Sequence, residues 1–336
     1  MTTTSTKPTI LLTGGAGYIG SCTALCLRDA GYAVVILDNL SRGHKETIEA
    51  LNLPFIEGSV GDTALVQSLC KKYQPQAVVH FAALAYVGES VHDPEKYFLN
   101  NTRDTLNFLS ALRAGGVSRF VFSSTCATYG IVPSPIAETS SQTPVNPYGR
   151  TKLAVEFAIK DYGAAYNFPH VIFRYFNVAG CHHSQLVGER HDPETHLIPR
   201  AILATQGEPP LDLFGTDYPT PDGTCIRDYI HVEDVAAAHV QAVAYLLGGG
   251  PSQILNIGTG QGHSVREVIG MVEKISGKQV PVIVAPRRAG DPPELIAAPG
   301  KIQQCLGWTP KCSSLENIVS SAHSWYLRQA NRAGKH

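Results

Sequence analysis

The sequence has little charge for its length and no excess of either sign. Only 16% of its 336 residues are charged, and 27 Lys and Arg stand against 28 Asp and Glu. Nucleic acids and anionic membrane surfaces attract proteins with a strong positive excess, so this balance supports neither kind of partner. The sequence also lacks any apolar run near the roughly 20 residues that a membrane-spanning helix requires. We therefore expect no nucleic-acid partner and no membrane partner.

The cysteines do not follow the spacing of a disulfide framework or of a metal site. The eight cysteines form no CxxC pair and no Cys/His ligand set, which argues against a disulfide or zinc framework. The His-rich stretch from His182 to His196 has little carboxylate organisation in the sequence, so we interpret it as a solvated or substrate-lining loop and expect no metal. Reduced thiols and a start without the apolar segment of a signal peptide predict a cytoplasmic protein with a short disordered N-terminal tail.

The first half of the chain alternates apolar, strand-like runs with helical stretches. The runs cover residues 9–13, 33–38, 54–57, 76–82, 119–123 and 170–174, and a helix is expected over 18–30. Near-continuous apolar strands separated by helices predict an α/β fold with a doubly wound parallel sheet, the Rossmann arrangement. Ligands of such sheets bind at the carboxyl ends of the strands.

Beyond about residue 180 this alternation ends. The stretches 207–210 and 217–223 are rich in turn residues, and prolines flank a short strand-like run at 280–286. We predict a Rossmann domain over 1–180 and a smaller mixed α/β lobe over 181–336. A strand-like run at 254–258 suggests that a segment around 230–260 returns to the first sheet.

A glycine pattern follows the first strand at Gly14, Gly17 and Gly20. Glycines at this spacing suit a tight turn, the close approach of a pyrophosphate and close packing of the next helix. Asp38 ends the second strand 18 residues after Gly20. A carboxylate there accepts hydrogen bonds from the adenosine ribose and repels a 2′-phosphate. The pattern predicts a bound dinucleotide and favours NAD over NADP, although the nearby Arg42 weakens that preference.

Tyr148 and Lys152 lie four residues apart, which places them on one face of a helix about one turn apart. An ammonium there favours tyrosinate, so we expect a phenol pKa below its usual value near 10. A substrate hydroxyl that loses its proton to tyrosinate can release a hydride to a nicotinamide. Thr125 ends the preceding strand, where its hydroxyl can bond both the tyrosinate and the substrate. We predict Thr125, Tyr148 and Lys152 as the catalytic set.

Together these motifs resemble the extended short-chain dehydrogenase/reductase family. The similarity runs nearly end to end, through residues 80–90, 122–130, 146–149, 174–177, 227–232 and 286–291, and is strongest with members that act on UDP-sugars. It implies reversible interconversion of UDP-glucose and UDP-galactose, with NAD as a resident catalyst. It also implies a homodimer packed through long helices at 94–115 and 147–168.

The resemblance further implies which residues hold each ligand. The cofactor set is Gly14, Gly17, Tyr18, Ile19, Gly20, Asp38, Asn39, Ser59, Val60, Phe81, Ala82, Asn100, Tyr148, Lys152 and Tyr175. The nucleotide-sugar set is Thr125, Tyr148, Asn177, His196, Leu197, Phe214, Arg227, Arg288, Asp291 and Leu295. The two arginines suit a diphosphate, Asp291 suits ribose hydroxyls, and Phe214 suits the edge of a uracil. Some members have Asp at Ser59 and Lys at Ala85, so we expect an altered affinity for NAD rather than altered chemistry.

In the implied mechanism, Tyr148 takes the proton of the sugar C4 hydroxyl while the C4 hydride passes to NAD. The 4-keto sugar then turns over about its link to the diphosphate, and the hydride returns to its opposite face. Members selective for plain hexoses have a Tyr at the position of Leu295. The smaller leucine leaves room for an acetamido group, so N-acetylated UDP-hexosamines are further candidate substrates.

Three alternatives remain. A 4,6-dehydratase or a decarboxylase on the same scaffold would need a carboxylate just after Thr125, where this chain has Cys126 and Ala127. A non-catalytic NAD-sensing protein would be free to lose Tyr148, Lys152 or the arginines, and all of these are present.

Overall fold

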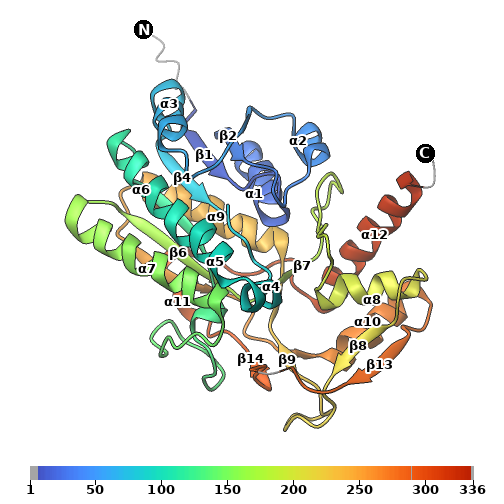
Figure 1. Ribbon diagram of the computed structural model, residues 1–336. Coiled ribbons are helices and arrows are strands. Elements are labelled where there is room, and N and C mark those ends of the chain that lie inside the picture. Colours follow the sequence, from blue (N-terminus) through green and yellow to red (C-terminus); the bar gives the residue numbers. More distant parts are fainter. Residues whose placement is uncertain (1–6, 289, 334–336) are drawn as a thin grey trace. The chain divides into compact units, whose positions relative to one another are not determined.

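The computed structural model describes residues 7–288 and 290–333 (Figure 1). Residues 1–6 of the expected N-terminal tail lie outside the described residues. The strands are β1 (Thr9–Thr13), β2 (Ala33–Asp38), β3 (Phe55–Glu57), β4 (Ala77–His80), β5 (Phe120–Thr125), β6 (His170–Tyr175), β7 (Asn177–Ala179), β8 (Leu211–Phe214), β9 (Ile226–Arg227), β10 (Tyr229–His231), β11 (Gln253–Ile257), β12 (His263–Ser264), β13 (Val282–Ala285) and β14 (Glu294–Leu295).

The α-helices are α1 (Tyr18–Asp29), α2 (Lys45–Leu51), α3 (Thr63–Tyr73), α4 (Val87–His92), α5 (Pro94–Tyr97), α6 (Asp104–Ala114), α7 (Pro147–Tyr166), α8 (Leu197–Thr205), α9 (Val232–Leu247), α10 (Val265–Ser276), α11 (Gly300–Leu306) and α12 (Leu315–Ala333). A π-helical segment, η1 (Phe98–Arg103), joins α5 to α6, and a short 3₁₀ turn, η2 (Cys126–Thr128), follows β5. Among the described residues, no helix combines the length and the apolar character needed to cross a membrane.

The main sheet has seven strands in the order β11-β6-β5-β4-β1-β2-β3. Strand β1 pairs in parallel with both β2 and β4, and the strand order reverses on either side of β1. The predicted Rossmann sheet is therefore confirmed. Strand β11 is hydrogen-bonded beside β6, so the chain returns to this sheet late in the sequence.

Most of the apolar runs of the sequence form strands that are buried on both faces, while β3 at the edge of the sheet is only partly buried. Leu11, Val78, Phe120 and Phe122 belong to a core cluster whose other side comes from helices, including Phe108 of α6. Helices α3, α6 and α7 pack next to one another against this cluster (Figure 1). Such a core holds the carboxyl ends of the strands, and the loops that follow them, in fixed positions.

The chain divides into two compact units, each described here by itself. The first unit runs to Gly130 and includes Gln142–Arg174 and Ala236–Leu255. The second unit contains Ile131–Ser141, Tyr175–Val235 and the chain from Asn256 onward. In the second unit, α8, α10 and α12 share a core cluster that includes Ile202, Val272 and Ile318. Its strands form small sheets, in which β8 pairs in parallel with β13 and β9 lies between β12 and β14.

Candidate active site

The glycine loop after β1 has the geometry that a dinucleotide requires. Gly14 has a φ of +73°, and a Cβ on it would lie 2.6 Å from the backbone nitrogen of Ala82. A Cβ on Gly20 would overlap the Gly14 carbonyl oxygen, so only glycine allows α1 to start so close to the loop. Gly17 precedes α1 and has no side-chain cap. The N-terminus of α1 therefore presents backbone amides and a positive dipole end, which suit a pyrophosphate.

Asp38 is held at the end of β2 by two backbone amides. Its carboxylate accepts hydrogen bonds from Ala16 N at 2.9 Å and Leu40 N at 2.8 Å. Burial raises the pKa of Asp38, and the two backbone bonds oppose that rise. The side chain is thus fixed beside the glycine loop, where the ribose of a dinucleotide is expected.

Arg42 does not present an unopposed charge near Asp38. Its guanidinium pairs with the Glu89 carboxylate at 2.7 Å and lies 4.7 Å over the ring of Tyr86. Glu89 also accepts bonds from Lys96 and from the Tyr97 hydroxyl. Because its charge is already opposed by Glu89, Arg42 weakens the preference for NAD less than its position in the sequence suggests.

The other expected cofactor residues of the first unit have ordered surroundings. Phe81 packs against the His239 ring at 4.7 Å, and Val60 is buried. Asn39 accepts a bond from Ser41 N, and Ser59 accepts one from Gly61 N. The Asn100 amide donates to Asn101 at 2.9 Å.

The local sequence explains how Tyr148 is placed. Asn146 caps α7 by accepting a hydrogen bond from Gly149 N at 2.8 Å, and Pro147 occupies the first turn. A Cβ on Gly149 would lie 2.6 Å from the Ala127 carbonyl oxygen. Gly149 therefore lets α7 start directly against η2, which follows Thr125. Our sequence interpretation assigned no role to this glycine, although a glycine in the first turn of a helix was the signal for one.

The predicted catalytic set comes together in the first unit. The side chains of Thr125 and Tyr148 are hydrogen-bonded to each other. Lys152 is buried one turn further along α7, and its amine donates to the Ser123 carbonyl oxygen at 2.7 Å. The same amine lies 4.9 Å from the centre of the Phe122 ring. One hydroxyl, one phenol and one amine thus converge at the carboxyl end of β5.

Our prediction of a lowered pKa for Tyr148 is wrong for the protein by itself. Burial raises the pKa of this phenol to about 12, and the hydrogen bond with Thr125 only partly opposes the rise. Burial also lowers the pKa of Lys152 to about 7, against the opposing effect of the Glu156 carboxylate. Desolvation therefore outweighs the expected ammonium–phenolate attraction, and a further positive charge beside the phenol is needed to bring its pKa down.

A buried ion pair lies directly behind this set. Glu156, one turn after Lys152, pairs with Arg174 of β6 at 2.6 Å, and the two side chains are 0% and 2% exposed. The Ser124 hydroxyl also donates to Glu156, and Arg174 donates to the Tyr129 hydroxyl at 2.8 Å. Sequence reasoning did not find this network, because its partners are far apart in the chain.

In the second unit, several expected substrate residues lie close together. Leu295 of β14 is paired in register with Arg227 of β9, and the Arg227 guanidinium lies 3.3 Å from the Asp291 carboxylate. The Arg288 guanidinium lies 3.8 Å over the ring of Phe214. Two cations, a carboxylate and an aromatic ring are the groups expected around a nucleoside diphosphate.

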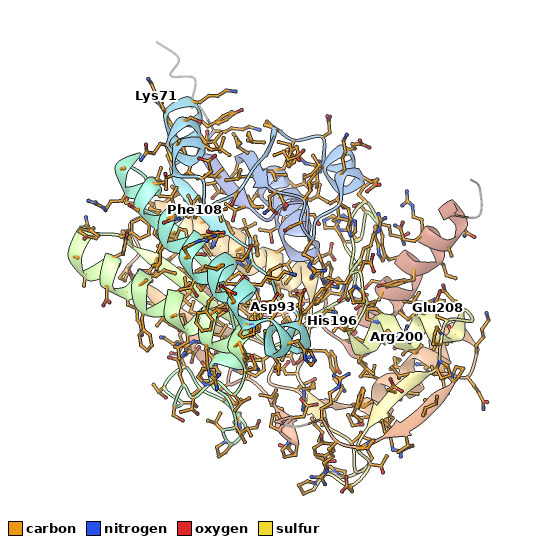
Figure 2. All side chains as sticks on the ribbon, viewed as in Figure 1. Lys71, Asp93, Phe108, His196, Arg200 and Glu208 are labelled. Carbon is orange, nitrogen blue, oxygen red and sulfur yellow. The ribbon has the colours of Figure 1, made fainter. Side chains whose placement is uncertain are left out.

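The remaining expected residues occupy the ends of elements. Figure 2 labels His196, which immediately precedes α8, and Arg200 within that helix. Leu197 is the first residue of α8, and the His196 carbonyl oxygen accepts a hydrogen bond from Arg200 N. Asn177 begins β7, where its backbone N–H donates to Asp228, and Tyr175 is buried at the end of β6.

Comparisons with known proteins agree with this geometry. Residues 10–258 match the model of the NAD dependent epimerase/dehydratase family. A UDP-glucose 4-epimerase from Rhizobium leguminosarum bv. trifolii is 49% identical over 95% of this chain and 98% of its own length. The crystal structure of the UDP-glucose 4-epimerase from Brucella ovis with NAD is 48% identical, covers 94% of this chain and 98% of its own, and has a TM-score of 0.92. The UDP-Glc/GlcNAc 4-epimerase from Campylobacter jejuni is 44% identical, covers 96% and 99% of the two chains, and has a TM-score of 0.84.

Proposed function

The chain belongs to the NAD dependent epimerase/dehydratase family, and we propose that it interconverts UDP-glucose and UDP-galactose at C4 of the sugar with bound NAD. The observation that carries this proposal is the hydrogen-bonded Thr125–Tyr148 pair beside the buried Lys152, in a chain similar to such epimerases over nearly its whole length. The glycine loop and the fixed Asp38 carboxylate are the residues that fit NAD.

The first unit supplies the acid–base chemistry. Tyr148 takes the proton from the C4 hydroxyl, and Thr125 orients both oxygens by hydrogen bonding. Lys152 holds positive charge beside the phenol and so favours tyrosinate. When NAD is bound, its positively charged nicotinamide supplies the hydride acceptor and donor of the reaction. The proton returns from Tyr148 to the sugar oxygen at the end of the cycle.

The second unit supplies the residues that bind the substrate. Arg227 and Arg288 bind the diphosphate, Asp291 accepts ribose hydroxyls, and Phe214 borders the uracil. Anchoring through the uridine diphosphate leaves the sugar free to turn over between the two halves of the reaction. A 4,6-dehydratase is not favoured, because Cys126 and Ala127 place no carboxylate after Thr125.

An assay without added cofactor tests the proposal. Because the cycle returns its hydride, we expect the purified protein to carry NAD and to convert UDP-galactose to UDP-glucose with none supplied. The amount of NAD released when the protein is denatured shows whether the cofactor is bound. The amount of UDP-glucose formed shows whether turnover occurs without added NAD. An apo protein that consumes one NAD per sugar would instead be a dehydrogenase.

Lys152→Met is expected to reduce turnover most at low pH. The pKa of Lys152 is about 7, so its ammonium is charged below that pH and neutral above it. The variant therefore loses the charge that favours tyrosinate mainly below about pH 7. The measurement is turnover per bound NAD across the pH range for both proteins, expressed as the ratio of Lys152→Met turnover to wild-type turnover at each pH. A Lys152→Met/wild-type ratio that does not change with pH would contradict this role, and Lys152→Arg, which keeps the charge, is the control.

Leu295 is proposed to set the tolerance for N-acetylated sugars. It is paired with Arg227 across β14 and β9, so a larger side chain there intrudes beside a residue proposed to bind substrate. We expect measurable interconversion of UDP-N-acetylglucosamine and UDP-N-acetylgalactosamine. We expect Leu295→Tyr to lower the kcat/KM for these sugars, relative to that for UDP-galactose, by at least about tenfold.

The control for this prediction is Leu295→Met, which nearly conserves volume and should leave the ratio of the two kcat/KM values close to that of the wild type. No turnover of either N-acetylated sugar by the wild-type protein at high enzyme concentration would refute the proposal.

We further propose a cytoplasmic homodimer. None of the eight cysteines, which all lie in the described part of the chain, forms a disulfide, and this suits a reducing compartment. In the first unit, exposed apolar side chains lie on neighbouring helical segments: Val91 on α4, Leu99 on η1, Leu106 on α6 and Phe157 on α7. Such a patch suits burial against a second copy. A monomer mass in sedimentation at micromolar concentration would contradict the dimer.

A further inference from the structure

The loop that leads into α8 brings two carboxylates and two imidazoles together. Glu189 and Glu194 are buried, with side chains 3% and 8% exposed, while His191 and His196 are 24% and 46% exposed. One ligand atom from each of the four residues lies within 4.8 Å of the others. The spacing of these residues in the sequence did not reveal this arrangement. We refer to Glu189, His191, Glu194 and His196 as the Glu/His cluster.

We propose that the Glu/His cluster binds a divalent transition-metal ion, such as Zn²⁺, in four-coordinate geometry. Imidazole nitrogen and carboxylate oxygen are both ligands that Zn²⁺ accepts. Each imidazole turns its Nδ1 atom toward both carboxylates. Each imidazole therefore places one nitrogen close to both carboxylates.

The four distances between the imidazole nitrogens and the carboxylate oxygens are close to those between ligands of a small tetrahedral site. The Nδ1 atom of His191 lies 3.3 Å from Glu189 Oε1 and 3.5 Å from Glu194 Oε2. The Nδ1 atom of His196 lies 3.1 Å from Glu189 Oε1 and 2.9 Å from Glu194 Oε1. Zn–N and Zn–O bonds of ordinary length place tetrahedral ligands about 3.3 Å apart. Only small shifts of the side chains are needed to receive the ion.

The surroundings hold the carboxylate ligands in place. The Tyr326 hydroxyl of α12 donates to Glu194 Oε2 at 3.2 Å, and His196 N donates to Glu194 Oε1 at 2.9 Å. The Trp325 indole donates to the Glu189 carbonyl at 2.8 Å. A Cβ on Gly188 would lie 2.5 Å from the Trp325 ring, so this glycine allows the loop to pack tightly against α12. Partners of this kind orient the ligands of metal sites.

A dication would balance the charges of the cluster. Two buried carboxylates need two positive charges nearby. Protonated imidazoles can supply them, but the His191 and His196 rings lie 4.7 Å apart, so their two charges repel each other. One divalent ion balances both carboxylates while both imidazoles stay neutral. The alternative to a metal site is an ion-pair network between the four side chains. Titration with a metal ion distinguishes these two possibilities.

The experiment is a calorimetric titration of the chelator-treated, NAD-containing protein with Zn²⁺. We expect one ion per chain, and we expect Co²⁺ to give the intense visible absorption of four-coordinate cobalt. Removing one ligand by Glu189→Gln should weaken Zn²⁺ binding by at least about 100-fold, and removing the supporting hydroxyl by Tyr326→Phe should weaken it by about tenfold. If Glu189→Gln does not fold, Tyr326→Phe still tests the proposal, because this variant keeps the aromatic ring and removes only the hydroxyl.

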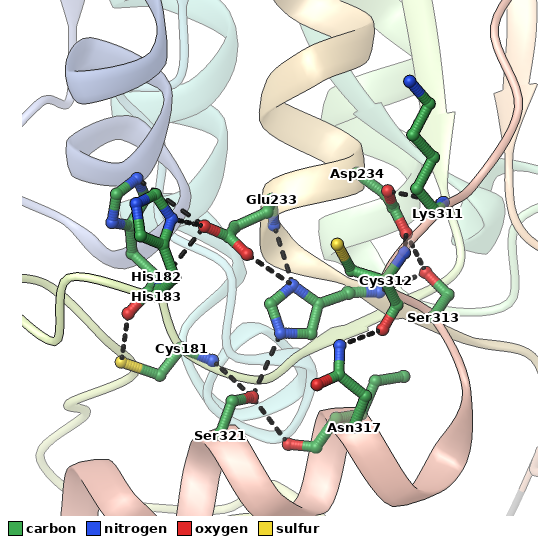
Figure 3. A network of polar contacts seen from close by, with 12 residues as sticks. Cys181, His182, His183, Glu233, Asp234, Lys311, Cys312, Ser313, Asn317 and Ser321 are labelled. Carbon is green, nitrogen blue, oxygen red and sulfur yellow. Dashed lines mark hydrogen bonds and ion pairs between the residues drawn. The ribbon is translucent and has the colours of Figure 1, made fainter. Parts of the chain in front are cut away.

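The control is His183→Asn. His183 is exposed and bonds to the Glu233 carboxylate in a second His/Glu group of the same unit (Figure 3). Its removal should leave the stoichiometry and affinity for Zn²⁺ unchanged. Loss of binding in His183→Asn with retention in Glu189→Gln would place the ion at that second group and overturn the proposal. A wild-type protein that takes up no stoichiometric Zn²⁺ would also overturn it.

Discussion

Tyr148→Phe is expected to lower turnover of UDP-galactose by about 10²–10⁴-fold, the range that general-base catalysis contributes. The substitution keeps the ring that packs at the start of α7 and removes only the phenol oxygen, which is bonded to Thr125. No other group of the proposed catalytic set can replace it, since the Thr125 hydroxyl is far less acidic and the Lys152 amine donates to a backbone carbonyl. The measurement is kcat per bound NAD.

Tyr162→Phe is the matched control. It makes the same chemical change on the same helix, about 21 Å further along its axis, where the ring contacts Tyr166 and Phe168. We expect Tyr162→Phe to retain normal turnover and both variants to bind UDP like the wild type. Near-normal epimerisation by Tyr148→Phe would refute the assignment of the base.

The main sheet could be predicted because short segments of the sequence carry the signals for its strands and for the turn after β1. The residues of β1 and β2 are apolar apart from Thr9, Thr13 and Asp38. The glycine loop that follows β1 can serve few purposes other than a tight turn into a helix. The predicted range 33–38 coincides with β2, and the predicted helix over 18–30 ends one residue later than α1. The shared face of Tyr148 and Lys152 follows from helix geometry alone, so sequence spacing was sufficient for it.

The electrostatics of the site could not be predicted in the same way. The sequence shows that an ammonium is near the phenol, but not that Lys152 is buried and Tyr148 partly buried. Desolvation is the largest influence on the pKa of both groups. Partners that are distant in sequence were also missed. Glu156 meets Arg174 only because α7 packs on the sheet that contains β6, and Glu189 meets His196 only because the loop before α8 folds back on itself.

The second large effect is expected from Arg174→Met. Arg174 and Glu156 form a buried ion pair, to which Tyr129, Ser124 and Gln142 add hydrogen bonds. Removing the guanidinium leaves a carboxylate buried with only neutral donors. Breaking a buried pair from one side costs about 3–5 kcal/mol of unfolding free energy. The loss should appear in urea unfolding as a lower midpoint, followed by far-ultraviolet circular dichroism because both tryptophans, Trp308 and Trp325, lie in the second unit.

Two controls isolate the cause of this loss. Arg28→Met breaks a pair whose side chains are 42% and 55% exposed, and such surface pairs contribute less than about 1 kcal/mol. The double variant Arg174→Met/Glu156→Gln removes both charges, so it should recover part of the stability lost in Arg174→Met. Because Ser124 adjoins Thr125 and Glu156 follows Lys152 by one turn, the single variant should also lower turnover by displacing the catalytic set. A cost as small as that of Arg28→Met, or no recovery in the double variant, would contradict a buried pair that supports this end of the sheet.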